Sequence, residues 1–136
     1  RSKMTVQELL IKHEGLRLKP YRDTVGKLTI GIGRNIDDNG ITKDEALYLL
    51  NNDIERCKQE LRNNISFYAI LSDNIKIVLI DLCFNMGITK LLGFKNMILH
   101  LRDREWLLAS EDLLDSNYTE QVGNRAIELS EMIKNG

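Results

Sequence analysis

The chain has 136 residues, of which 43% are apolar and 29% are charged, and this balance excludes a disordered chain and favours one soluble globular domain. The formal net charge is −1, and no run of 18 apolar residues predicts a membrane span. Cys57 and Cys83 are too few and too far apart in sequence for a disulfide scaffold or a zinc site. We therefore expect two free thiols and no bound metal.

Charge is distributed unevenly along the chain. Lysine and arginine outnumber acidic residues over positions 1–34, whereas the remainder of the chain is acidic. A basic segment of this kind suits an anionic polymer, either nucleic acid or cell wall, although a solvated surface with scattered lysines has the same composition.

The first predicted element is a short helix. Thr5 is placed as its N-cap and Glu8 as the third helical residue, which is the pattern of a capping box. Gly15 predicts the end of the helix, because glycine readily adopts the conformation that closes a helix. This assignment leaves Glu14 on the last turn.

Short β-prone segments follow, at Leu18–Tyr21 and Leu28–Ile32. The intervening turn begins at Asp23 and contains Gly26, so we expect a small antiparallel sheet. Residues 36–40 are predicted to form a short loop.

A second capping box, formed by Thr42 and Glu45, begins a helix of about 20 residues, or roughly 30 Å, which is long enough to bridge two lobes. Its apolar stripe comprises Leu47, Leu50, Ile54, Cys57 and Leu61.

A third helix is predicted over Ile75–Met86, which is apolar almost all round, as in a helix buried at the centre of a domain. Weaker helices are expected at Lys95–Leu101, Arg104–Leu114 and Gly123–Lys134. The predicted class is α+β, mostly helical, with a small N-terminal antiparallel sheet and a larger helical lobe joined by a long helix. We expect residues 1–136 to form one domain, with a small lobe at about 15–60 and a helical lobe at about 61–136 that includes helix 5–14.

Glu14 and Asp23 are the candidate chemical groups. The negative end of a helix dipole favours the protonated form of a nearby carboxyl, so Glu14 suits a general acid. Asp23 lies in a turn open to solvent and suits an ionised carboxylate, and such contrasting settings divide the work of a glycosidase pair. From these residues alone, however, the pattern favours a surface glutamate and a turn aspartate that caps its own backbone, because a Glu and an Asp at this spacing are common.

Several ordered blocks of sequence surround this pair. They are Glu14-Gly15-Leu16-Arg17-Leu18-Lys19, Tyr21-Arg22-Asp23-Thr24-Val25-Gly26, Thr29-Ile30-Gly31-Ile32-Gly33, Gly40-Ile41-Thr42-Lys43-Asp44-Glu45-Ala46, Phe84-Asn85-Met86-Gly87, Gly93-Phe94 and Asn124-Arg125-Ala126. Over residues 4–134 the chain resembles the T-even phage lysozyme family.

The resemblance implies an inverting hydrolysis of the bond between N-acetylmuramic acid and N-acetylglucosamine in peptidoglycan. Glu14 would donate the proton, and Asp23 and Thr29 would hold the attacking water. No metal or organic cofactor is implied. Arg125 would orient Glu14, unless it is an ordinary exposed helical arginine. Substrate contacts would come from Phe84, Asn85 and Tyr118, with Phe84 alternatively a core residue.

The chain departs from the family pattern at three positions. Arg34 stands where the family commonly has histidine, and His13 stands where it often has aspartate. The tryptophan that precedes Asn-Arg-Ala in the family has no counterpart, and Tyr118 is the nearest aromatic residue.

The expected partner is the glycan strand of peptidoglycan, with no nucleic acid, no stable membrane insertion and a monomeric chain. We expect a protein made in the cytoplasm of a bacterial host that acts on the wall in the periplasm. The alternatives are a non-catalytic peptidoglycan-binding domain and a lysozyme-like domain of a virion or toxin. Nucleic-acid binding rests only on the basic first 34 residues, without an aromatic platform or recognition helix.

Overall fold

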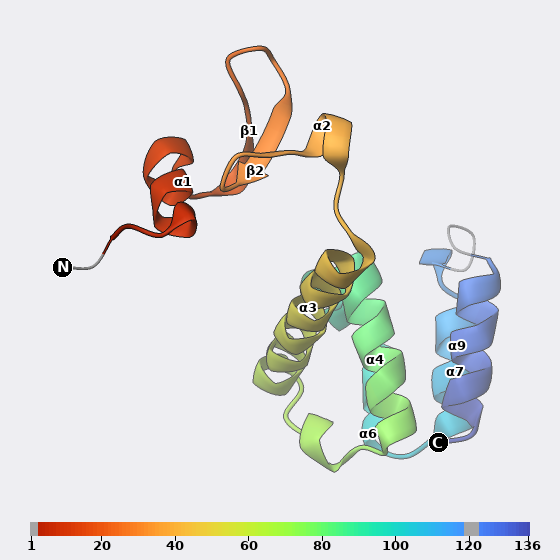
Figure 1. Cartoon of the computed structure of the whole chain (residues 1–136). Coiled ribbons are helices and arrows are strands. Elements are labelled where there is room, and N and C mark those ends of the chain that lie inside the picture. Colours follow the sequence, from red (N-terminus) through yellow and green to blue (C-terminus); the bar gives the residue numbers. More distant parts are fainter. Residues whose placement is uncertain (1–2, 119–122) are drawn as a thin grey trace. The chain divides into compact units, whose positions relative to one another are not determined.

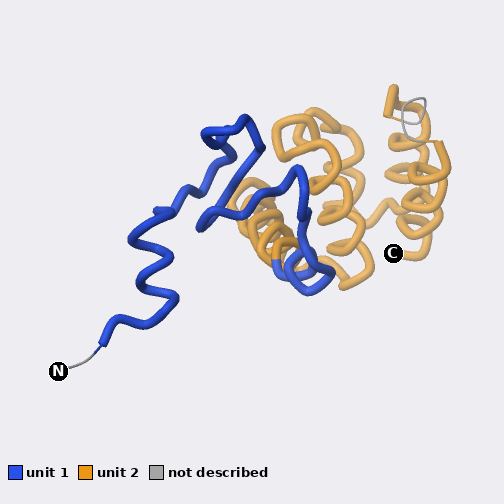
Figure 2. The backbone as a smooth tube through the Cα atoms, turned by 45° about the horizontal axis from the view of Figure 1, so that its top comes forward, with its two compact units in different colours: residues 1–48 blue, residues 49–136 orange. Residues whose placement is uncertain are grey.

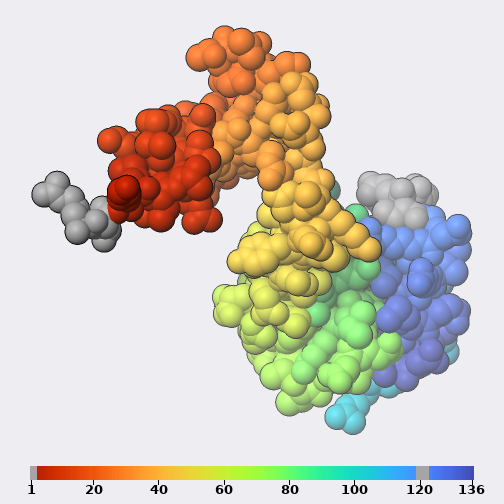
Figure 3. All heavy atoms as spheres, in the orientation of Figure 1, coloured from red at the N-terminus to blue at the C-terminus, as the bar shows by residue number. Residues whose placement is uncertain are grey.

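The computed structural model describes residues 3–118 and 123–136, which fall into two compact units. The first unit is Arg1–Tyr48 and the second is Leu49–Gly136 (Figure 2), and Figure 3 draws the heavy atoms of the chain as spheres coloured by residue number. The small-lobe and helical-lobe boundaries inferred from the sequence stay a prediction. Each unit is described below by itself.

The first unit contains two short helices, a small sheet and the beginning of a long helix (Figure 1). Its strands pair in the order β1-β2-β3, and both pairings are antiparallel. Thr29 of β2 lies opposite Tyr21 of β1 on one side and Asn35 of β3 on the other. The elements are α1 (Val6–Glu14), β1 (Arg17–Arg22), β2 (Leu28–Gly31), β3 (Arg34–Asn35) and α2 (Ile36–Asn39).

The predicted ends of α1 are confirmed. The Thr5 hydroxyl accepts a hydrogen bond from the Glu8 N–H at 3.1 Å, and the Glu8 carboxylate accepts from the Thr5 N–H, which completes the capping box. Gly15 follows the last helical residue with φ of +76°, a value that favours glycine. Glu14 is therefore the last residue of the helix.

The long helix α3 (Lys43–Asn64) has 22 residues, close to the predicted length. The Thr42 N–H donates to the Glu45 carboxylate at 2.8 Å, and the Glu45 N–H donates to the Thr42 hydroxyl at 3.1 Å. The second predicted capping box is thus confirmed. The boundary between the two units falls within this helix.

The second unit is helical, and its core gathers side chains from most of its helices. Helix α7 packs along α9 and against α6, while α4 packs against α9 and α5. Cys57 and Cys83 lie in this core as free thiols, as expected. The helices here are η1 (Tyr68–Ile70), α4 (Asp73–Met86), α5 (Ile88–Leu92), α6 (Lys95–Arg102), α7 (Trp106–Leu114) and α9 (Asn124–Lys134).

The prediction that α4 is buried all round is wrong within this unit. Leu79 is fully buried, whereas Ile77 is 55% exposed and Ile80 is only partly buried. The reason is that the neighbouring helices cover one side of α4, which carries Ile75, Val78, Leu79, Leu82 and Cys83.

Of the other predictions from the sequence, some are confirmed and one is wrong. The α+β class is confirmed, as are the weaker helices, whose bounds shift by one or two residues. The loop predicted at residues 36–40 is instead the one-turn helix α2, because the Asn35 side chain accepts a hydrogen bond from the Asp38 N–H and caps it. In the described part of the chain, every helix is too short or too polar to cross a membrane.

Candidate active site

Glu14 lies at the end of α1 and its carboxyl group faces the turn between β2 and β3. A methyl group placed on Gly33 would come within 2.9 Å of Glu14 Oε2 and 3.1 Å of its Cδ. The end of the helix and this turn therefore meet at the carboxyl group.

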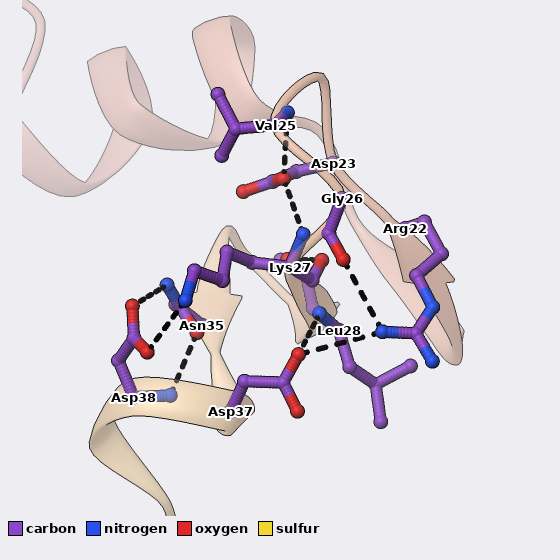
Figure 4. A network of polar contacts seen from close by, with 10 residues as sticks. Arg22, Asp23, Val25, Gly26, Lys27, Leu28, Asn35, Asp37 and Asp38 are labelled. Atoms are coloured by element: carbon purple, nitrogen blue, oxygen red, sulfur yellow. Dashed lines mark hydrogen bonds and ion pairs between the residues drawn. The ribbon is translucent and has the colours of Figure 1, made fainter.

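Asp23 is half-buried in the turn between β1 and β2, and one of its oxygens holds that turn together (Figure 4). Asp23 Oδ1 accepts hydrogen bonds from the N–H groups of Val25 at 3.0 Å and Lys27 at 2.8 Å. The self-capping interpretation of Asp23 is thus correct as a description of Oδ1. The other oxygen, Oδ2, accepts no hydrogen bond from the described residues and remains open to a ligand.

Thr29 is 3% exposed and its hydroxyl is fixed in direction. The hydroxyl donates its hydrogen to the Lys27 carbonyl at 2.9 Å. Because a hydroxyl has one hydrogen and two lone pairs, it can act toward a further partner only as an acceptor.

The backbone of Lys27 connects Asp23 and Thr29. Its N–H donates to Asp23 Oδ1, and its carbonyl accepts both the Thr29 hydroxyl and the Asp23 N–H, the latter at 2.9 Å. One residue's peptide groups thus hold both side chains that were predicted to position water. Together with Glu14, the first unit presents a carboxyl, a carboxylate oxygen and a hydroxyl acceptor, the groups needed for acid catalysis with a positioned water.

Two aspartates of α2 brace this hairpin, and sequence analysis missed them. Asp37 Oδ2 accepts from the Leu28 N–H at 2.7 Å, and Asp38 Oδ1 accepts from Lys27 Nζ at 3.0 Å. The bond from Lys27 is the largest cause that lowers the pKa of Asp38. Asn35 followed by acidic residues is a helix-start signal, and it would have placed both carboxylates on α2.

Arg34, which replaces the histidine common at this position of the family pattern, makes an ion pair of its own. Its guanidinium donates to both carboxylate oxygens of Glu45, at 2.9 and 2.8 Å, and to the Gly40 carbonyl at 3.1 Å. The hydrogen bond from Arg34, followed by that from the Thr42 backbone, lowers the pKa of Glu45 from 4.5 to about 2.

A depressed carboxyl pKa stabilises the folded state above the unfolded value of 4.5, and this contribution is lost as the pH falls through about 2. In Arg34→Gln the pKa of Glu45 should rise toward 4.5, while the bonds from Thr42 keep it below that value. An NMR titration of the Glu45 carboxyl measures this. Arg17→Gln is the control, because Arg17 lies over the Tyr21 ring instead, 4.2 Å from its centroid. An unchanged Glu45 midpoint in Arg34→Gln would contradict the assignment.

The predicted substrate contacts belong to the second unit, which places two of them together. Asn85 and Tyr118 line one pocket of about 580 Å³, with Met86, Lys90 and Phe94 among its other walls. The Tyr118 hydroxyl is buried without a hydrogen-bond partner among the described residues. The Tyr118 ring packs edge-on against the ring of Phe94, with 6.4 Å between the ring centroids.

Phe84 lies outside this pocket lining and is 45% exposed. The alternative that placed Phe84 in the core is therefore wrong for the second unit.

Arg125 is paired with Asp81 rather than exposed without a partner. Its Nε donates to Asp81 Oδ1 at 2.8 Å, and this bond is the main cause that raises the pKa of Arg125. No sequence pattern pointed to Asp81, which lies 44 residues earlier in the chain. The role of Arg125 in orienting Glu14 stays a prediction.

The chain is similar to known proteins along almost its whole length. A family model described as phage lysozyme matches residues 11–130. Two proteins of Dictyostelium discoideum, named probable T4-type lysozymes 1 and 2, are each 25% identical to the chain, with 97% of the chain and 95% of the relative aligned. The pre-baseplate central spike protein Gp5 of Enterobacteria phage T4 is 26% identical over 98% of the chain, and the match covers 28% of that protein.

Proposed function

Because the chain belongs to the phage lysozyme family, we propose that it hydrolyses the β-1,4 bond between N-acetylmuramic acid and N-acetylglucosamine in bacterial peptidoglycan. The observation that carries this proposal is the shared anchoring of Asp23 and Thr29 on the backbone of Lys27. That arrangement leaves one acceptor of each side chain free, which is what a bound water requires.

In the proposed reaction, Glu14 is the general acid. Its carboxyl proton passes to the glycosidic oxygen as the bond from that oxygen to the anomeric carbon breaks. The departing sugar leaves as a neutral alcohol, and Glu14 is left as a carboxylate. This role is the one that a protonated carboxylic acid fulfils in glycosidases.

The attacking water is held by Asp23 and Thr29. Asp23 Oδ2 accepts one hydrogen of the water, and a Thr29 lone pair accepts the other, because the Thr29 hydrogen is already donated to Lys27. A water held by both hydrogens presents a lone pair to the anomeric carbon. Attack from the face opposite the leaving group inverts the configuration of that carbon, and the water's proton passes to Asp23.

The pocket that contains Asn85 and Tyr118 is proposed to contact the sugar chain. Amide groups and an aromatic ring suit this role, since sugars offer hydroxyl and N-acetyl groups together with apolar faces. Arg125, held by Asp81, is proposed to orient Glu14.

The likeness to a segment of the spike protein Gp5 supports a second setting for the same activity. In that setting the chain would serve as the lysozyme domain of a virion rather than as a free endolysin. In either setting we propose that it acts on the wall outside the cytoplasmic membrane.

The experiment that tests the proposal combines two measurements on purified peptidoglycan. We expect new reducing ends to accumulate, and proton NMR of the earliest products to detect the α anomer, because water attack inverts the β linkage. Asp23→Asn keeps an oxygen that can accept the hydrogen bonds from the Val25 and Lys27 N–H groups, but it removes the negative charge. This variant is expected to release reducing ends more slowly. Wall binding without new reducing ends would favour the non-catalytic alternative, and an initial β anomer would rule out inversion.

A further inference from the structure

We propose that Gly33 is a positioning residue for the catalytic acid, because its missing side chain leaves the space that the Glu14 carboxyl group occupies. This inference rests on the proposed function only in assigning Glu14 the role of catalytic acid. The contact itself lies within the first unit and is independent of any activity.

The contact involves the whole reactive end of the glutamate. A Cβ at position 33 would lie 2.9 Å from Glu14 Oε2, 3.1 Å from Cδ and 3.1 Å from Cγ. Real Cβ atoms essentially never approach other heavy atoms within 3.0 Å, so a methyl group here requires the glutamate to move. The helix backbone of Glu14 is fixed by the bond from the Gly15 N–H to the Ile11 carbonyl, at 2.8 Å. The side chain must therefore rotate away from the turn.

Gly31 separates this steric effect from a backbone effect. It lies two residues earlier, at the end of β2, with φ of +72°, and Gly33 in the following turn has φ of +67°. A Cβ on Gly31 would meet no atom within 4 Å, apart from its chain neighbours. Both glycines relieve the same backbone strain, but only Gly33 also makes room for Glu14.

The expected consequence is a loss of turnover rather than of substrate binding. An acid that is misplaced by about 1 Å reduces catalysis by roughly 10²-fold, because proton transfer requires close alignment with the leaving oxygen. Gly33→Ala should therefore lower kcat by about 10- to 100-fold with little change in KM, and should alter the alkaline limb of the pH profile of kcat, where a general acid loses its proton. Gly31→Ala should lower kcat much less, although it introduces backbone strain at a similar positive φ.

A double-mutant cycle on stability tests the contact without an activity assay. Tm is measured for Gly33→Ala and Gly31→Ala, each in the wild-type chain and in a Glu14→Ala background. Removal of the glutamate side chain should reduce the Tm loss caused by Gly33→Ala and leave that of Gly31→Ala unchanged, because contacting residues are non-additive and separated ones are additive. If Gly33→Ala alone does not fold while Gly31→Ala does, the double variant Gly33→Ala/Glu14→Ala should recover folding.

The proposal is overturned if Gly33→Ala lowers Tm equally in both backgrounds, or if it keeps the kcat and pH profile of wild type. A wild-type chain without hydrolytic activity would instead refute the proposed function, and the stability cycle would still report on the contact.

Discussion

Glu14→Gln is expected to fold like the wild-type chain and to lose about 10²–10⁴-fold in the rate of peptidoglycan hydrolysis. The amide has the same shape as the carboxyl group, so its contact with the Gly33 turn is retained. It cannot, however, transfer a proton to the leaving oxygen as a carboxylic acid does. Release of reducing ends at saturating substrate measures the loss, and an unchanged Tm shows that the fold persists.

Glu8→Gln provides the matched control, because it neutralises another carboxylate of the same helix. Glu8 serves the capping box of α1, and among the described residues its carboxylate hydrogen-bonds only to Thr5. Its replacement should leave turnover close to that of wild type. Near wild-type turnover in Glu14→Gln would remove Glu14 from the role of acid.

Leu79→Ala should destabilise the second unit by about 2–5 kcal/mol. Leu79 has no exposed surface, so the truncated side chain leaves a cavity that the surrounding core fills only in part. Urea denaturation followed by far-UV circular dichroism measures the change in the free energy of unfolding.

Ile77→Ala is the control on the same helix. Ile77 is 55% exposed, so its truncation should cost less than about 1 kcal/mol. Ile80, which is partly buried, should give an intermediate value. Equal losses for Leu79→Ala and Ile77→Ala would show that α4 does not bury the side identified here.

Local signals in the sequence predicted most helix ends correctly. A capping box such as Thr5 with Glu8, or a glycine after the last turn, acts within a few residues, so it can be recognised without knowledge of the rest of the fold. Tertiary contacts were less predictable. The exposure of Ile77 depends on which neighbours cover α4, and an apolar residue does not itself record that choice.

In the candidate site, too, local sequence signals were easier to predict than tertiary contacts. Glu14, Asp23 and Thr29 were predicted through ordered sequence blocks, whereas the Lys27 peptide bonds to Asp23 and Thr29 and the partners of the nearby arginines were not. The Arg125–Asp81 and Arg34–Glu45 pairs join positions 44 and 11 residues apart, and composition or periodicity gives no sign of which charges will meet. The contact of Gly33 with Glu14 is equally long-range, since it exists only once α1 meets the sheet.

The anchoring of Asp23 and Thr29 on the Lys27 peptide groups has a consequence for how this site can diverge. The Lys27 side chain reaches only an exposed aspartate, whereas its N–H and carbonyl make the bonds that matter to the site. At position 27 the geometry of Asp23 and Thr29 therefore depends on the main chain more than on the identity of the side chain. Substitutions at position 27 should therefore be tolerated, with proline the chief exception, because it has no N–H to donate to Asp23. A residue whose side chain tolerates exchange can therefore be indispensable through its peptide groups.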